Sequence, residues 1–550
     1  MLTGGDLDVL TGDYLAELTM LILGRDQLKH PDLGYARTFL GQMEEGLGLA
    51  LDRGVRIVTN AGGLNPAGLA GALRTLAATL GLDVTVAHVE GDDVRDRFPG
   101  ALTANAYLGA WGIAEGLAAG ADVVVTGRVT DASLVVGPAA AHFGWARDDW
   151  DALAGATVAG HVLECGTQAT GGNYAFFTEL PALRHPGFPV AEVRADGSAV
   201  ITKHPGTDGA VTVDTVRAQL LYEITGPRYL GPDVTTRFDT VALEPDGPDR
   251  VLVSGVRGEP PPATVKVAVT ALGGYRNEAL FVLTGLDIDA KAALIREQVD
   301  LPDARWTLAR TDRADADVQE EASALLRCVV RGPDPKVVGK AFVARAVELA
   351  LGSVPGFHLA TLPGDAVPYG EYRAEYLPAA EIAQVLVLPD GTARPIAPVL
   401  TDGSGPGAAC GPDAAAAGGP EAGGAGGADG PQPGDAGPAP ATRRLPLGTL
   451  VGARSGDKGG AVTLGVWVRD PRAWPWLTAT LTADRLRALL PETAPHAIAR
   501  HPLPNLHAVL FVIDGLLGSG VAEGARFDPQ GKAVGEWLRA RLVDLPEDLL

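Results

Sequence analysis

Short runs of Val and Ile alternate with stretches of helically spaced Leu and Ala over the first part of the chain. The runs predict strands at 55–60, 83–89 and 121–127, and the stretches predict helices at 68–81 and 105–120. Strands that alternate with helices in this way are typical of βαβαβ units around a mainly parallel sheet. We therefore expect an α/β, ligand-binding region over residues 1–185.

From about residue 186 the chain changes to short alternating runs between polar turns, such as VAEV, AVITK and RVLVSGVRG. Alternation with a period of two predicts strands with one buried face, which favours antiparallel pairing. Helices are expected near 212–224, 286–299 and 337–352. Residues 186–401 are therefore expected to form an α+β section of the same large domain.

A tract rich in Gly, Ala, Pro and Asp occupies residues 402–442 and contains no Val, Leu, Ile or aromatic residue. Such a composition buries little apolar surface, so it predicts a disordered linker. Beyond it, residues 445–550 contain the strand-like runs LGTLVGA, AVTLGVWV and LHAVLFVIDG, with helices near 482–490 and 532–543. This mixture predicts a small, separate α+β domain.

The charge balance narrows the class of partner. The chain of 550 residues has 45 Lys and Arg against 67 Asp and Glu, and its net charge of −22 disfavours nucleic acid and anionic membranes. Three Cys without a CxxC spacing indicate a reducing compartment and no metal finger. No apolar run approaches the ~18 residues of a membrane span, and the acidic start does not resemble a signal peptide. We therefore expect a cytoplasmic protein.

The first candidate chemistry lies where the strand at 55–60 ends. Gly62 and Gly63 allow a tight turn, and Pro66 is suited to the first helical position. Such a turn aims backbone N–H groups at the sheet edge where α/β proteins bind ligands. The residues expected to bind an anionic or carbonyl group here are Asn60, Gly62, Gly63 and Asn65. The alternative is a well-formed turn, capped by Asn65, without a ligand.

Charged side chains follow the next two strands. Asp92 and Asp93 come after 83–89, while Arg128, Thr130, Asp131 and Ser133 come after 121–127. Because parallel strands share one carboxyl edge, we expect Arg128 and Thr130 to bind a substrate carboxylate or phosphate, with Asp92 and Asp131 moving protons. The alternative is an Arg–Asp ion pair beside a residue that caps a helix.

The segment HVLECGTQATGGN places His161 and Cys165 on one face of a helix. Either they form a base and a nucleophile, or Cys165 is a structural cysteine; the second is favoured because a helix C-terminus destabilises a thiolate. The glycines that follow allow a ligand close to the backbone. The expected substrate-binding residues here are Gln168, Thr170, Gly171 and Gly172, and the alternative is a plain loop without a ligand.

Two further segments carry basic side chains. His204 is either a proton-transfer group or a solvated surface histidine. Arg454 and Lys458 lie on the glycine-rich segment GARSGDKGGA, expected as a loop that either binds an anion of the substrate or is a charged surface turn. It does not meet the phosphate-loop pattern, and the sequence lacks the motifs of common hydrolases, zinc proteases, kinases and dinucleotide-binding proteins.

Taken together, these stretches resemble the acyclic terpene utilisation (AtuA) family. The matching runs include GGDLDVLTGDYLAELTM, VTNAGGLNP, EGDD, TANAYLGA, VVTGRVTDASL, HVLECGTQATGGN and GVRGEPPPATVKV. Beyond residue 445, ARSGDKGG, LPNLHAVLF and FDPQGKAVGEWL resemble the family's small ferredoxin-like C-terminal domain. The resemblance also implies a further strand and turn ahead of the segment that opens this chain at Leu2.

The resemblance implies a place in the catabolism of acyclic isoprenoids such as citronellol and geraniol, beside CoA-thioester enzymes. We expect an enzyme of lyase, hydratase or hydrolase type that acts on a branched acyl-CoA or a related carboxylic acid, with an oxyanion held by N–H groups near Gly62–Gly63 or Gly171–Gly172. No redox cofactor and no metal is expected, and CoA enters only as part of the substrate. We expect a homo-oligomer with acyl-CoA carboxylase pathway partners. The alternative is a non-catalytic substrate-binding or assembly subunit for CoA-thioester enzymes.

Limited proteolysis tests the predicted linker. Because residues 402–442 lack apolar anchors, a protease should cut there first and release a folded fragment of about 100 residues from the C-terminal end. Mass spectrometry locates the cut, and circular dichroism reports whether the fragment is folded. A first cut elsewhere, or a fragment that aggregates, contradicts the prediction.

Overall fold

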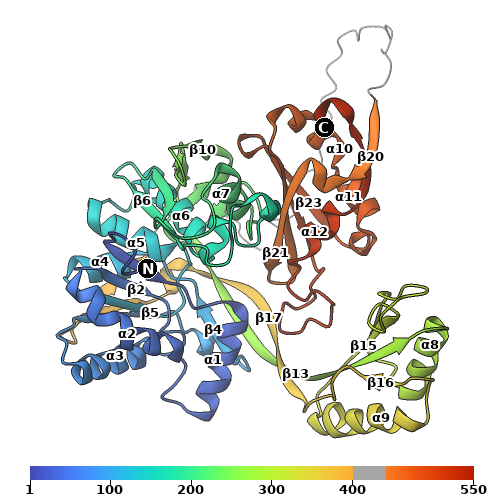
Figure 1. Ribbon diagram of the computed structural model, residues 1–550. Coiled ribbons are helices and arrows are strands. Elements are labelled where there is room, and N and C mark those ends of the chain that lie inside the picture. Colours follow the sequence, from blue (N-terminus) through green and yellow to red (C-terminus); the bar gives the residue numbers. More distant parts are fainter. Residues whose placement is uncertain (400–440) are drawn as a thin grey trace. The chain divides into compact units, whose positions relative to one another are not determined.

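The computed structural model describes residues 1–399 and 441–550 (Figure 1). These residues form two compact units: Met1–Val269 with Arg373–Gly518 and Gln530–Leu550, and Thr270–Tyr372 with Ser519–Pro529. The expected linker at 402–442 lies outside the described residues except for its last two, and Thr442 already begins strand β20 (Thr442–Pro446). The domain boundaries expected from the sequence stay predictions.

A six-stranded sheet organises the N-terminal part of the first unit. Its order is β1 (Val9–Gly12), β2 (Arg56–Thr59), β5 (Val123–Thr126), β3 (Val86–Glu90), β18 (Gln384–Val387) and β19 (Ala393–Ile396). The first four strands are parallel, whereas β18 and β19 are antiparallel. The expected α/β region with a mainly parallel sheet is therefore confirmed.

Helices cover both faces of this sheet, which explains why its strands are almost continuously apolar. On one face, Ile57 and Val123 pack with α2 (Arg37–Asp52) and α3 (Pro66–Leu80). On the other face, Val58 and Val124 share a core with α4 (Trp111–Ala118), α5 (Ser133–Phe143) and α6 (Trp150–Leu163). Figure 1 shows α2 and α3 together on one side of β2 and β5. A further helix, α1 (Glu17–Lys29), follows β1.

The helix expected over 105–120 begins later than the apolar pattern indicates. Residues Thr103–Ala106 form strand β4, and α4 starts only at Trp111. The physical reason lies in two buried polar contacts: the Asn105 amide donates to Asp92, and the Ala110 N–H donates to the Asp233 carboxylate. Both contacts fix an extended path ahead of the helix.

The middle section is antiparallel, as expected for an α+β section. One sheet has the order β10 (Ala242–Pro245), β11 (Val251–Ser254), β7 (Ala199–Lys203) and β6 (Pro189–Val193). A second sheet has the order β12 (Arg257–Glu259), β9 (Thr235–Arg237) and β8 (Arg228–Leu230). Helix α7 (Val213–Leu220) lies within the expected 212–224 range and begins at Thr212, which caps it.

The second unit is built around strand β13 (Thr264–Thr284), which begins in the first unit. The sequence indicated two separate runs here, whereas the structure has one strand of 21 residues. Within the unit it pairs with β15 (Ser323–Gly332), β16 (His358–Leu359) and β17 (Val367–Pro378), and β14 (Arg305–Ala309) pairs with β15. Helices α8 (Ile288–Val299) and α9 (Phe342–Glu348) share one core with these strands.

Most of the C-terminal domain belongs to the first unit, whereas its residues Ser519–Pro529 belong to the second. Its sheet has the antiparallel order β21 (Val451–Lys458), β22 (Ala461–Val468), β24 (Ala508–Ile513) and β23 (Ile498–Leu503). Helices α10 (Trp474–Thr480), α11 (Ala483–Leu489) and α12 (Val534–Arg539) complete it. The helix expected over 532–543 ends at Arg539 because β25 (Leu542–Pro546) pairs with β20.

The prediction of a glycine-rich loop around Arg454 and Lys458 is wrong. Both residues lie on strand β21, and the chain turns only at Gly459–Gly460. A side chain on Gly452 would collide with the Trp467 ring, and one on Gly456 would collide with the Tyr222 ring. The glycines therefore permit close packing of a strand. Across residues 1–399 and 441–550, no helix has the length and apolar character needed to cross a membrane.

Replacing Gly456 with Ala tests this close packing. The added methyl group must displace the buried Tyr222 ring, so Gly456→Ala should lower the free energy of unfolding by about 1–3 kcal/mol. The matched control is Gly71→Ala on α3, where a methyl group meets open space and should be neutral or stabilising. Urea unfolding measures both variants, and equal stabilities would contradict the prediction.

Candidate active site

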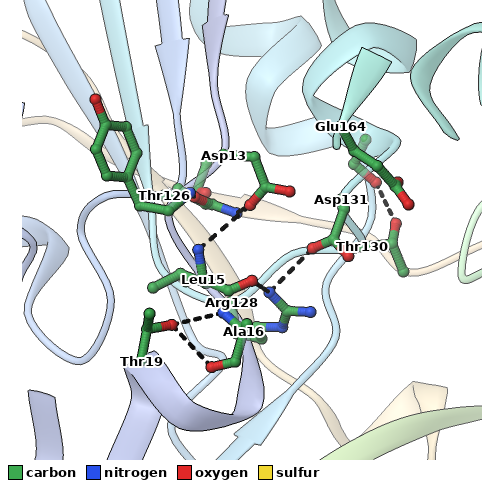
Figure 2. Close-up of polar contacts among 12 residues, drawn as sticks. Asp13, Leu15, Ala16, Thr19, Thr126, Arg128, Thr130, Asp131 and Glu164 are labelled. Carbon is green, nitrogen blue, oxygen red and sulfur yellow. Dashed lines mark hydrogen bonds and ion pairs between the residues drawn. The ribbon is translucent and has the colours of Figure 1, made fainter. Parts of the chain in front are cut away.

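Polar side chains gather where three parallel strands end. Asp13 directly follows β1, Asn60 follows β2, and Arg128 and Asp131 follow β5. The Asn60 amide donates to an Asp13 carboxylate oxygen at 2.7 Å. The Arg128 guanidinium lies 3.0 Å from an Asp131 carboxylate oxygen and donates to the Leu15 carbonyl at 2.9 Å (Figure 2). The sheet therefore brings together the strand-end residues that the sequence indicated, and adds Asp13.

Arg128 is buried and fixed by its surroundings. Its backbone N–H donates to Asp92 at 2.8 Å, and its guanidinium stacks 4.2 Å from the centre of the Tyr107 ring. Asp92 also accepts from the Asn105 amide at 2.8 Å, and desolvation raises the pKa of Asp92 to about 6. Asp92 thus holds the loop that carries Arg128 from behind. This placement suits a positioning role better than the expected proton transfer to substrate.

Helix α6 delivers two further groups at its C-terminal end. Glu164 follows the helix, and its carboxylate lies 3.2 Å from His161 Nδ1. The Glu164 side chain is only 7% exposed. Desolvation raises the pKa of Glu164, and Asp131 adds to the rise, although His161 opposes it. Figure 2 shows Glu164 on the same side of the strand ends as Asp131 and Thr130.

Basic groups come from two other elements. Lys458 on β21 lies 6.0 Å from the centre of the Tyr229 ring, and Lys266 on β13 lies 4.9 Å from the centre of the Tyr107 ring. Desolvation opposes ionisation of Lys458, but Tyr229 and Glu223 outweigh it and raise the pKa of this lysine. The C-terminal domain therefore supplies a firmly charged cation to a group of residues from the N-terminal sheet.

The carboxyl side chains at the strand ends contact solvent, but surrounding protein atoms also remove part of their hydration. Asp13 is exposed and Asp131 is partly exposed, yet burial among protein atoms is the main reason why the pKa of Asp13 is well above its usual value. These side chains interact with one another electrostatically and form one group at the strand ends. We call this group the polar recess and define it by Asp13, Glu17, Tyr107, Arg128, Asp131, Glu164, Glu223, Tyr229, Lys266 and Lys458.

The N–H groups of the glycine turns, which were expected to hold an oxyanion, make hydrogen bonds within the protein. The N–H groups of Gly63, Gly171 and Gly172 donate to the carbonyls of Asn60, Gln168 and Thr167, respectively. A side chain on Gly62 would collide with the Thr126 carbonyl. Asn65 caps α3 through Gly68 N–H at 2.9 Å, as the sequence indicated. The N–H groups of Gly63, Gly171 and Gly172 are therefore engaged within the turns beside the recess.

Three more expected binding residues are engaged within the protein. Thr170 donates to the Gly187 carbonyl at 2.7 Å, and the Thr130 hydroxyl lies 2.5 Å from that of Ser133. Gln168 accepts a hydrogen bond from Arg454, whose guanidinium stacks 4.4 Å from the centre of the Tyr222 ring. Arg454 thus fastens β21 to the segment after α6, and of the two basic residues on β21 only Lys458 belongs to the recess.

The surroundings of His204 do not suit a proton-transfer group at the recess, and those of Cys165 do not suit a nucleophile. The His204 ring packs against Gly4 and Gly5, ahead of β1, whereas the recess forms after β1 ends. Desolvation and the neighbouring Glu164 carboxylate raise the pKa of Cys165 far above its ordinary value. A thiolate is therefore disfavoured, which supports the structural interpretation of this cysteine.

Several recess residues were not identified from the sequence. Asp13 follows a run of four strand residues, VLTG, too short for the apolar pattern to stand out, although it meets the strand-end rule that identified Asp131. Glu164 lies within the segment HVLEC, between His161 and Cys165, which the sequence offered as a base and a nucleophile. Tyr107, Tyr229 and Lys266 give no local signal, because they reach the recess only through tertiary packing.

The pH dependence of stability tests the electrostatics of this region. Desolvation, with Glu223 and Glu17, raises the pKa of Asp457 to about 7, so the native state holds this proton more tightly than the unfolded chain. That contribution to stability is complete below the ordinary pKa of Asp457 and is lost as pH rises through about 7. This contribution to the free energy of unfolding should therefore fall between about pH 4 and about pH 7.

Asp457→Asn cannot ionise and should flatten this dependence. Asp484→Asn is the matched control, since the Asp484 side chain is 95% exposed, and it should keep the wild-type slope. Urea unfolding across the pH range measures all three proteins. Parallel slopes for wild type and Asp457→Asn would contradict the prediction.

Comparison with known proteins identifies the family to which this chain belongs. No curated protein and no solved structure matches the chain. Residues 445–544 match the AtuA ferredoxin-like domain, which agrees with the antiparallel sheet and helices of the C-terminal domain. Residues 1–388 match the acyclic terpene utilisation family protein AtuA, so the chain belongs to the acyclic terpene utilisation (AtuA) family.

Proposed function

We propose that this protein is an enzyme of acyclic terpene utilisation that transfers a proton beside the carbonyl group of a branched acyl-CoA or a related carboxylic acid. Family membership supports the metabolic setting. The observation that carries the proposal is the convergence of Asp13, Asp131 and Glu164, which come from three elements and interact with one another electrostatically. A carboxyl group beside a substrate carbon is suited to remove or return a proton.

The three carboxyl groups have different surroundings. Asp131 is paired with the Arg128 guanidinium at 3.0 Å, whereas burial raises the pKa values of Asp13 and Glu164. A raised pKa brings a carboxyl group closer to the working pH, where it both takes up and releases a proton readily. Two such groups beside a carboxyl group that is paired with Arg128 are suited to acid–base chemistry, in which one removes a proton and the other supplies one.

The cations complete this chemistry. Removal of a proton next to a thioester or carboxylate carbonyl places negative charge on the carbonyl oxygen. Lys458 lies beside the Tyr229 ring and interacts electrostatically with Asp131 and Tyr107, which places its charge at the recess. We assign to Lys458 the role of balancing the substrate's negative charge, in place of the turn amides expected from the sequence.

The remaining parts of the proposal concern context. We propose a cytoplasmic, homo-oligomeric enzyme that needs no redox cofactor, with CoA present only as part of the substrate, working in sequence with acyl-CoA carboxylases. The cysteine composition supports a reducing compartment: Cys165 and Cys328, the cysteines among the described residues, are both free thiols. The family's association with terpene utilisation supports the pathway partners.

A substrate panel with two recess variants tests the proposal. Purified protein is incubated with branched acyl-CoAs and the matching free acids, and binding is read by thermal shift and turnover by mass spectrometry. Asp13→Asn keeps the shape and the contact to Asn60 but not the proton-transfer group, so turnover should fall about 10²–10⁴-fold while binding persists. Lys458→Met should weaken binding itself, by about tenfold or more.

Lys29→Met is the control for removal of a lysine charge, because Lys29 is exposed in the last turn of α1. It should behave as wild type in both measurements. Unchanged binding and turnover in both recess variants would overturn the proposal. A ligand-dependent thermal shift in wild type without any product would instead favour the non-catalytic substrate-binding or assembly subunit.

A further inference from the structure

His161 is a buried imidazole with a fixed orientation. His161 lies in the last turn of α6 and is only 1% exposed to solvent. The ring meets the Phe238 ring edge-on, with 5.3 Å between centres, and lies 5.7 Å from the Tyr229 ring. The His161 carbonyl accepts a hydrogen bond from the Gln219 side chain at 2.9 Å, which fixes the helix end that carries it. Aromatic packing and a backbone contact therefore leave the imidazole little freedom to turn.

The fixed ring places one nitrogen at Glu164. His161 Nδ1 lies 3.2 Å from a Glu164 carboxylate oxygen, and the two residues are three positions apart at the end of α6. The second oxygen, Oε2, is buried and meets no hydrogen-bond partner among the described residues, and the His161 ring nitrogens likewise make no hydrogen bond of regular geometry there. The proximity of Nδ1 to the carboxyl group is therefore a polar contact, and a proton on Nδ1 interacts more strongly with the ionised carboxylate than with the neutral acid. The contact thus favours the ionised form of Glu164.

Other charged and titratable groups face Glu164 from every element around it. They are Asp13 after β1, Asp131 after β5, Tyr229 on β8 and Lys458 on β21, in addition to His161 on α6 and the adjacent Cys165. Asp13, Asp131 and the helix C-terminus favour a protonated carboxyl group, whereas Lys458 and His161 favour an ionised one. Of the two opposing groups, only His161 is in direct polar contact at 3.2 Å.

We propose that His161 is a positioning residue for Glu164: its Nδ1 orients the carboxylate towards the polar recess and keeps it ready to accept a proton. The assignment rests on the proposed function, because it makes Glu164 the base among the three carboxyl groups. His161 itself is sealed behind Tyr229 and Phe238 and acts only through Glu164. In the proton transfer the substrate C–H bond breaks, an O–H bond forms on the Glu164 carboxylate, and the electron pair moves onto the carbonyl oxygen as an enolate.

Two substitutions separate the polar contact of Nδ1 with Glu164 from the packing of the ring. His161→Asn keeps an N–H donor near the Nδ1 position, whereas His161→Phe keeps an aromatic ring without a donor. Phe238→Leu is the control, because it loosens the same ring packing and leaves the contact between His161 and Glu164 in place. All variants are used as full-length protein without added substrate.

Infrared difference spectroscopy across a pH titration measures the protonation of Glu164 directly, and the spectrum of Glu164→Gln identifies its carboxyl band. The pKa of Glu164 should rise by about one unit or more in His161→Phe and stay near the wild-type value in His161→Asn and Phe238→Leu. In an active enzyme, the acidic limb of the pH–rate profile should shift upwards in the same variant.

Equal titration of Glu164 in wild type and His161→Phe would overturn the proposal, as would an equal shift in Phe238→Leu. These outcomes are independent of turnover. If the substrate panel yields no product while the titration shifts as expected, the proposed function fails and the pairing of His161 with Glu164 stands. If product forms and the titration does not shift, the pairing fails and the function stands.

Discussion

A buried guanidinium must find partners for its charge and its N–H groups inside the protein, and this requirement organises the region around Arg128. The side chain binds the Leu15 carbonyl and the Asp131 carboxylate and stacks on Tyr107, while its backbone N–H donates to Asp92. Segments that follow β1, β3, β4 and β5 are thereby joined at one point. The polar recess depends on this junction, because Asp13 and Asp131 lie on two of the joined segments.

The C-terminal domain takes part in the site through close packing and one charge. Gly456 brings β21 against Tyr222, Arg454 reaches Gln168, and Lys458 then lies beside Tyr229. An isolated positive charge among these groups would be costly to bury, but the surrounding acids raise the pKa of Lys458 and keep it ionised. The packing and the electrostatics support each other, since the cation offsets repulsion among the carboxyl groups that its own domain helps to desolvate.

Local chemistry explains what the sequence could predict. Asn65 and Pro66 cap and begin α3 as expected, because a cap depends on neighbours within three residues. The strand-end rule placed Arg128 beside Asp92 because the parallel strands β5 and β3 share one edge. Lys458 was expected on a loop, since the glycines of β21 are explained only by Tyr222 and Trp467. Glu164 shows no distinguishing pattern and is recognised only from its burial beside His161.

The recess draws its parts from distant positions in the chain, with Asp13 near the start, Glu164 in the first third and Lys458 beyond residue 450. Contacts of such long sequence separation form late in folding, because the loops between them must close first. A ribosome that adds about 5–20 residues per second therefore releases the four parallel strands of the N-terminal sheet well before β21 exists. During synthesis the carboxyl groups at the sheet edge stay hydrated until Lys458 is made. The parallel strands can therefore pair before the polar recess is complete.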